Sequence, residues 1–224
     1  MHKTLALLTA AALALVAGPL QADPAQARAQ LEKKGVAFTP EAFLQKVAEG
    51  DADSATLFVE AGMDPSVKAQ TGRTALWVAV ERRQLAVLKA LLAGGVVPDE
   101  KNAPSMEGGK SLVFEAVDSG DAAYVRALVE AGADGKKAND YEVPPLAEAA
   151  RTGQLEMCEI LIKAGADANA APAGFPLLYG PVNEDHIEVV RLLLASGAKL
   201  GEHKQSIVEA AKTPEMRALL EAAE

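Results

Sequence analysis

The chain has 224 residues, half of them hydrophobic and only 4% aromatic, and its 31 acidic and 22 basic side chains give a formal charge of -9 at pH 7. This composition is typical of a folded protein with an ample core and excludes general disorder. The negative charge argues against a nucleic acid partner, because phosphates are usually met by a basic surface. The single cysteine, Cys158, excludes an intrachain disulfide and a zinc site built from cysteines.

The first 22 residues are typical of a secretory signal peptide. A short basic start precedes an apolar run from Leu5 to Val16, and the helix-breaking pair Gly18-Pro19 follows. The run has roughly 12 residues, whereas a membrane-spanning helix needs about 20. We therefore expect cleavage after Ala22 and a periplasmic mature protein. An uncleaved segment that tethers the chain to a membrane stays open as the alternative.

A capped helix is predicted directly after this segment. Asp23 suits the N-cap, Pro24 suits the first helical position, and Gly35 suits the residue after the helix end. A helix at this place would cover the apolar face that the first unit of a repeat array would otherwise expose. We therefore predict an N-terminal capping helix within residues 23–38.

The rest of the chain repeats itself with a period near 33 residues. Five apolar helical stripes each end at a glycine, and these glycines are spaced 33, 37, 33 and 32 residues apart. Glycine suits this place because the residue after a helix often adopts a left-handed conformation. An apolar residue stands 19 residues before each glycine, where we expect a first helix to open, and a turn separates it from the second helix. The glycines are Gly62, Gly95, Gly132, Gly165 and Gly197, the opening residues are Phe43, Leu76, Val113, Leu146 and Leu178, and the turns lie near Gly50, Arg83, Gly120, Gly153 and Asp185.

This arrangement resembles the ankyrin repeat, in which a turn and two antiparallel helices recur about every 33 residues. The segment from Thr71 to Ala79, T-G-R-T-A-L-W-V-A, is similar to the family motif D-G-x-T-P-L-H-x-A. The resemblance implies an all-α solenoid of five to six helix-turn-helix units after the capping helix, over residues 39–224. The expected units span residues 39–70, 71–102, 103–139, 140–170 and 171–201, with a partial sixth unit at 202–224.

Two units depart from the regular pattern. The 37-residue interval adds four residues to one finger, the loop that links successive units, within residues 102–108. In the fifth unit, Pro172, Pro176 and Pro181 crowd the first helix. We expect that helix to be short or distorted, because a proline inside a helix costs about 3 kcal/mol.

Residue types that carry catalysis are scarce after the first segment. Neither His186 nor His203 has a nucleophile or a sufficient set of metal ligands near it in the sequence. The segment Gly108–Ser111 matches the end of a phosphate-binding loop, but Pro104 stands where the opening glycine should be, and the segment falls in the register of the repeat turn. We therefore predict no catalytic residue, no metal site and no cofactor.

Three carboxylates, Glu81, Asp118 and Glu184, are placed by the repeat on outward positions of successive first helices. Catalysis by a carboxylate pair needs a raised pKa in a closed pocket, and a solenoid of short units offers an open groove instead. We interpret these carboxylates as solvated or partner-contacting. An envelope hydrolase with Asp118 or Glu184 as the base stays open as the alternative.

The aromatic residues fall into two groups. Trp77, Phe114 and Tyr179 occupy the position of the motif histidine, and we predict that they pack under the fingers. Tyr141 and Phe175 lie in the fingers themselves, where little core is available. Because exposed aromatic residues on a rigid scaffold are typical anchors for a protein partner, these two are either partner contacts or inter-finger packing.

In the ankyrin family the concave side, formed by the fingers and first helices, usually binds another protein. The resemblance therefore implies a non-enzymatic protein-binding module, which the signal peptide places in the bacterial periplasm. Stacked helices are stiff, so binding costs little ordering entropy, and an acidic surface favours a basic partner. An accessory factor of an exported enzyme and a toxin-neutralising immunity protein both stay open. The partner-binding residues that the register indicates are Lys68, Gln70, Arg73, Glu81, Arg82, Glu107, Lys110, Asp118, Tyr141, Arg151, Phe175 and Glu184.

Overall fold

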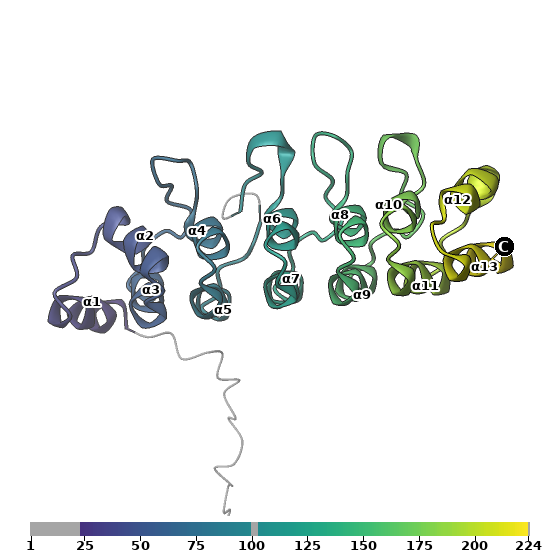
Figure 1. Cartoon of the computed structure of the whole chain (residues 1–224). Helices are drawn as coiled ribbons and strands as arrows, with labels where there is room; N and C mark the ends of the chain where they lie inside the picture. Colours follow the sequence, from purple (N-terminus) through teal and green to yellow (C-terminus); the bar gives the residue numbers. More distant parts are fainter. Residues whose placement is uncertain (1–22, 100–102, 224) are drawn as a thin grey trace, which may run out of the picture.

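The structure, a computed structural model, describes residues 23–99 and 103–223, and the signal peptide predicted at residues 1–22 lies outside these ranges. Over the described residues the regular backbone is helical, with no strand. The helices stack as pairs in a single row, with the first helix of each pair in one layer and the second helix in another (Figure 1). The prediction of an all-α solenoid behind a capping helix is confirmed.

Six helix pairs make up the row, and each of the six predicted units contains one pair. The first helices are α2 (Pro40–Glu49), α4 (Ala75–Glu81), α6 (Leu112–Asp118), α8 (Pro145–Arg151), α10 (Tyr179–Asn183) and α12 (Lys204–Ala210). The second helices are α3 (Ala52–Glu60), α5 (Leu85–Ala93), α7 (Ala122–Glu130), α9 (Leu155–Lys163), α11 (Ile187–Ala195) and α13 (Pro214–Ala222). Short 3-10 helices lie in three fingers, at Glu107–Gly109, Pro172–Gly174 and Gly201–His203.

The capping helix α1 (Pro24–Lys33) extends the layer of second helices, where it lies beside α3 (Figure 1). Its start is capped by the carboxylate of Asp23, which accepts a hydrogen bond from the backbone N–H of Ala25 at 3.0 Å. Leu31 on its inner face is 1% exposed, and the guanidinium of Arg28 lies 4.2 Å from the centre of the Phe38 ring. These contacts cover the apolar end of the first unit, which is the role that the sequence predicts.

The second helices of the first five units end at the glycines that set the repeat period. The five period-setting glycines have φ between 88° and 92°, a left-handed conformation that a side chain would strain. After each of them, the next N–H donates to a carbonyl five residues back, as Met63 does to Phe58 at 2.9 Å. The five apolar residues that open the first helices are all buried in one continuous core.

Successive helix pairs also contact each other at the turns between their helices. The residue just before a second helix packs on the turn of the preceding unit. The side chain of Gln84 lies on Gly50, and the ring of His186 lies on Gly153 so closely that a Cβ at residue 153 would meet it at 2.6 Å. His186 precedes α11 and is therefore part of a stacking contact, as expected for a turn residue.

The irregular units behave as the sequence predicts. Helix α10 has five residues, whereas α4, α6 and α8 have seven each, so crowding by prolines shortens the first helix of the fifth unit. The lengthened finger between α5 and α6 packs back on the core through Ala103, which is 9% exposed. The indole N–H of Trp77 donates to the carbonyl of Pro104 at 2.8 Å and ties this finger to the preceding unit.

Candidate partner-binding surface

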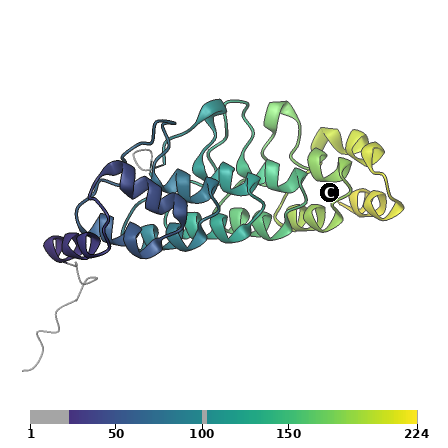
Figure 2. The same cartoon turned by 60° about the vertical axis from the view of Figure 1, so that its left-hand side comes forward.

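The fingers project from the layer of first helices, away from the second helices (Figures 1 and 2). We call the surface formed by the fingers and the first helices the finger surface. Its fingers are residues 61–74, 94–111, 131–144, 164–178 and 196–203, of which 100–102 are outside the described ranges.

Backbone hydrogen bonds fix the fingers within and between units. The N–H of Ala69 donates to the carbonyl of Arg73 at 2.8 Å and closes the first finger. The N–H of Asp140 donates to the carbonyl of Gly108 at 2.9 Å, which joins the third finger to the second. The side-chain amide of Asn169 donates to the carbonyl of Gly197 at 2.9 Å, which joins the fourth finger to the last. The fingers are therefore pre-ordered, which reduces the entropy lost when a partner binds.

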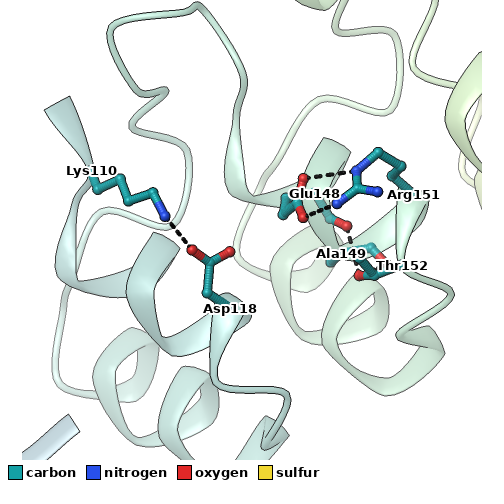
Figure 3. A network of polar contacts seen from close by, with 6 residues as sticks. All are labelled: Lys110, Asp118, Glu148, Ala149, Arg151 and Thr152. Atoms are coloured by element: carbon teal, nitrogen blue, oxygen red, sulfur yellow. Dashed lines mark hydrogen bonds and ion pairs between the residues drawn. The ribbon is translucent and has the colours of Figure 1, made fainter. Parts of the chain in front are cut away.

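Two ion pairs occupy equivalent positions in the second and third units. Arg73 and Glu81 are 2.8 Å apart, and Lys110 and Asp118 are 2.5 Å apart (Figure 3). Each pair joins the base of a finger to the last residue of the following first helix. The hydrogen bond to Asp118 raises the pKa of the Lys110 ammonium group. The structure thus brings together four predicted site residues as neutralising pairs.

The fourth unit forms a different pair. Arg151 occupies the place of Glu81 and Asp118, and its guanidinium donates to both carboxylate oxygens of Glu148, at 2.5 Å and 3.1 Å (Figure 3). This two-pronged contact raises the pKa of Arg151. The sequence analysis selected Arg151 but missed Glu148, which lies three residues earlier on the same helix.

The placement of Glu184 corrects the register drawn from the sequence. Residue 184 is the C-cap of α10, whereas Glu81 and Asp118 are the last residues of their helices. The true counterpart in the fifth unit is Asn183. The interval from Gly165 to Leu178 is one residue shorter than that from Gly132 to Leu146, so counting a full period of 33 overshoots by one position.

Tyr141 and Phe175 are the most exposed aromatic residues of the described chain, at 74% and 59%. Tyr141 lies beside Gly108 of the preceding finger, where a Cβ would be 3.7 Å from its ring. Phe175 makes an edge contact with Tyr179, the ring centres being 5.8 Å apart. Each residue makes one inter-finger or helix contact and still offers most of its ring to solvent.

The other predicted residues line the finger surface without forming a cluster. Arg82 is the C-cap of α4 and Glu107 begins the 3-10 helix of the second finger. Lys68 and Gln70 lie in the first finger, and all four are exposed.

A hollow of about 520 Å³ lies on the finger surface between the fourth and fifth units. It includes the predicted residues Arg151 and Phe175, and it adds Glu148, Asn183 and Tyr179, which the sequence analysis did not select for this surface. Its remaining lining is mainly apolar and comes from Val143, Ala147, Pro172, Pro176, Leu177 and Gly180.

Trp77 and Phe114 are 2% and 4% exposed, so their predicted packing under the fingers is confirmed. Tyr179 is only half-buried, and its hydroxyl bonds to that of Ser206 at 2.5 Å. Tyr179 therefore belongs to both groups that the sequence suggested, because it supports the solenoid and lines the hollow.

Several reactive side chains of the described residues have structural contacts. Within the described ranges, three or more histidine, cysteine, aspartate or glutamate residues nowhere gather as metal ligands would, and every helix is too short or too polar to span a bilayer. Ser111 caps α6 by accepting a hydrogen bond from the N–H of Phe114, which is a structural task. Burial raises the pKa of the Cys158 thiol to about 12, so the nucleophilic thiolate is suppressed. Asp118 is tied to Lys110 on an open surface.

Comparisons with known proteins agree with this architecture. The family described as "Ankyrin repeats (3 copies)" matches residues 43–140 and 116–204. The chain is 32% identical over 156 residues to the B-cell lymphoma 3 protein homolog of Mus musculus, which covers 66% of this chain and 34% of that protein. It is 30% identical over 128 residues to an ankyrin repeat protein of Fowlpox virus, covering 57% of this chain and 28% of the relative.

A bacterial relative is found as well. The chain is 32% identical over 108 residues to an ankyrin repeat-containing protein of Treponema pallidum, covering 48% of this chain and 35% of the relative. The chain thus spans between 28% and 35% of the length of these three relatives.

Proposed function

The chain belongs to the ankyrin repeat family, whose repeats are protein–protein interaction modules, and on that premise we propose that it binds a partner protein on its finger surface in the bacterial periplasm. The observation that carries the proposal is the pair of exposed aromatic rings, Tyr141 and Phe175, on fingers fixed by hydrogen bonds. Aromatic anchors on rigid supports are typical of interface hot spots.

The charge of the finger surface favours a basic partner. Arg73, Lys110 and Arg151 are each paired with a carboxylate of their own unit. By contrast, Glu142 and Glu184 are exposed and form no salt bridge within residues 23–99 and 103–223. Lys68 and Arg82 are also exposed on this surface without a salt bridge to any described residue, but the formal charge of the chain is -9. This acidic excess would speed the encounter with a basic protein.

The proposed export depends on the N-terminal segment. Expression of the full chain in a Gram-negative host, followed by fractionation and mass measurement, should give a periplasmic protein that begins at Asp23. An intact Met1 in the membrane fraction would contradict this and favour the tethered scaffold. Both an accessory factor of an exported enzyme and a toxin-neutralising protein fit this location, and addition of the captured partner to an activity assay separates them.

The binding itself is tested by comparing two faces of the molecule. The protein with Tyr141→Ala and Phe175→Ala should lose the partner that the wild-type protein captures from a periplasmic extract. The matched control changes Arg126→Ala and Leu155→Ala, which are exposed on second helices. A partner that tolerates the finger substitutions but not the control substitutions would move the binding site to the other face.

Enzymatic function is not favoured by the geometry. Asp118 is held by Lys110, and Glu184 is an exposed helix cap, so neither lies in the closed and desolvated site that a catalytic carboxylate needs. Substitution of either residue by alanine should shift partner affinity, and it should leave any hydrolysis by the purified protein unchanged.

A further inference from the structure

The hollow between the fourth and fifth units is bordered by two small residues at positions that are larger in other units. Ala147 stands where Trp77, Phe114 and Tyr179 stand in other units. Gly180 stands where Val78, Glu115 and Glu148 stand. The short side chain of Ala147 leaves space between α8 and α10, which is part of the hollow of about 520 Å³. Gly180 lets α10 pack closely on α8, since a Cβ there would lie 3.2 Å from the Cβ of Arg151.

The walls of the hollow are apolar and held in place. Phe175 is supported at the edge by Tyr179, and its N–H donates to the carbonyl of Pro172 at 3.1 Å. The N–H of Leu177 donates to the carbonyl of Ala170 at 3.0 Å and closes the finger below the ring. An aromatic ring that is fixed in this manner and still 59% exposed can receive an apolar group without reordering.

The polar side of the hollow determines which charge can sit beside that group. Arg151 donates from Nε and Nη2 to the two carboxylate oxygens of Glu148, so its charge is already paired with a carboxylate (Figure 3). Glu184 is one residue beyond the lining residue Asn183 and makes no salt bridge within the described ranges. Its charge interacts with Arg151 at longer range. A cation next to the apolar group could therefore form a direct pair with Glu184, a contact that no residue of the described chain makes.

We propose that this hollow receives one bulky apolar side chain of the partner protein, Leu, Met, Phe or Trp, flanked by a Lys or Arg that pairs with Glu184. The proposal rests on the proposed function and names the feature of the partner that the finger surface recognises. A loop or extended segment can present such a pair of side chains, because the hollow is open on the finger side and bounded by two rigid fingers.

The test uses peptides as probes, so it can be carried out before the partner is identified. A phage-displayed library of random 12-residue peptides is selected on the mature protein, and the enriched peptides are synthesised. We expect a consensus with a bulky apolar residue next to Lys or Arg. An acidic consensus, or enrichment without a shared apolar residue, would overturn the proposal.

Variants of the protein then show where the selected peptide binds. Ala147→Phe should fill the hollow with a ring that other units already carry at this position, and should weaken peptide binding about tenfold or more. The matched control is Ala123→Phe, the same change in the hollow between α5, α7 and α9, and it should leave affinity within about twofold. Equal affinity of wild type and Ala147→Phe would overturn the proposal.

Two further variants guard against misfolding and test the charge. Phe175→Ala removes one wall at an exposed position, so the fold persists, and it should also weaken the peptide. Glu184→Lys should weaken a consensus peptide and leave unchanged a peptide whose basic residue is replaced by alanine. An equal effect on both peptides would contradict the assigned pairing.

The outcomes separate this inference from the proposed function. Peptides or partners that resist Ala147→Phe but are lost with Arg73→Glu would bind elsewhere on the finger surface, so the function would stand and the inference would fail. Binding that no finger variant affects would overturn both. Dimerisation of the protein that Ala147→Phe abolishes, seen by sedimentation, would assign the hollow to a second copy of the chain and overturn the proposed occupant.

Discussion

The space under the fingers is filled in the second and third units and left open where the fourth and fifth units meet. Trp77 and Phe114 are almost fully buried in the first region, whereas Ala147 and Gly180 border a hollow in the second. The two helix layers continue through both regions without interruption (Figure 1). Stacking of the helices therefore does not depend on a large residue at this position in every unit, and the position is available for binding where it is small.

The largest expected effect comes from a substitution in the filled region, the second and third units. Trp77→Ala should destabilise the protein by about 3–5 kcal/mol, because it removes a buried ring and leaves a cavity. It also removes the hydrogen bond from the indole to the carbonyl of Pro104, which anchors the longest finger. Urea unfolding followed by circular dichroism measures the change.

The control for this prediction comes from the open region. Phe175→Ala should change the free energy of unfolding by less than about 1 kcal/mol, because the ring is mostly in solvent. Similar losses for Trp77→Ala and Phe175→Ala would show that the fingers of both regions contribute alike to stability, and the comparison between them would be wrong.

A second prediction sharpens the comparison at the stacking contacts. Gly120 and Gly153 both have left-handed backbones, with φ of 79° and 74°. Alanine should cost about 1–2 kcal/mol at either position through this strain. At Gly153 the new Cβ would also meet the ring of His186 at 2.6 Å, whereas nothing lies within 4 Å at Gly120. Gly153→Ala should therefore be more destabilising, by roughly 1–3 kcal/mol.

Thermal unfolding of the two variants measures this difference. The double variant Gly153→Ala with His186→Ala serves as its control, because it removes the collision and keeps the backbone strain. Its stability should approach that of Gly120→Ala. Equal losses of stability for the two single variants would show that the ring of His186 moves away from residue 153 at little cost.

Much of the fold could be predicted from the sequence because it depends on main-chain requirements. The residue after a helix often adopts positive φ, so glycine is a strong marker of helix ends, and Gly62 and its four counterparts mark them here. The turn positions are confirmed in the same manner, even at Arg83 and Asp185, which have φ of 57° and 59° without being glycine.

Less of the candidate site could be predicted, because side-chain partners depend on neighbours in space. Arg73 and Lys110 stand at finger bases and pair with the acid at the end of the next helix. In the fourth unit Val143 takes that place and offers no charge, so Arg151 pairs with Glu148 on its own helix instead. The hollow had a signal in the sequence, since Ala147 is the one small residue among aromatic counterparts, but its shape also depends on Gly180.

A third prediction concerns the two turns that lack glycine. Arg83→Gly should stabilise the protein by roughly 0.5–1 kcal/mol, because it relieves a left-handed backbone and loses only one exposed hydrogen bond, to the carbonyl of Ser119. Asp185→Gly should be nearly neutral. Aspartate tolerates this conformation, and its carboxylate accepts a hydrogen bond from the hydroxyl of Thr213 at 2.9 Å. The urea concentrations at the unfolding midpoints rank the stabilities of the two variants. A destabilised Arg83→Gly would contradict the backbone strain assigned to residue 83.

The smallest expected effect lies in the surface ion pairs. A double-mutant cycle with Lys110→Ala and Asp118→Ala should give a coupling of about 0.2–1 kcal/mol, because both side chains are partly solvated. The cycle for Arg151 and Glu148, three residues apart on one helix, should give about 0.2–0.5 kcal/mol. Both couplings should fall as salt is raised from 0.05 M to about 1 M, where the screening length is about 3 Å.

The pH dependence separates the two pairs further. Pairing with Asp118 raises the pKa of Lys110 above its ordinary 10.5, so its coupling is fully present below that value and is lost as the pH rises through the raised pKa. Arginine stays charged over this range, so the Arg151–Glu148 coupling should persist where the Lys110–Asp118 coupling has gone. Unfolding cycles repeated at neutral and strongly alkaline pH measure both. Loss of the arginine pair together with the lysine pair would show that the fourth unit opens in alkali, and that its local pair does not hold the finger surface as the structure indicates.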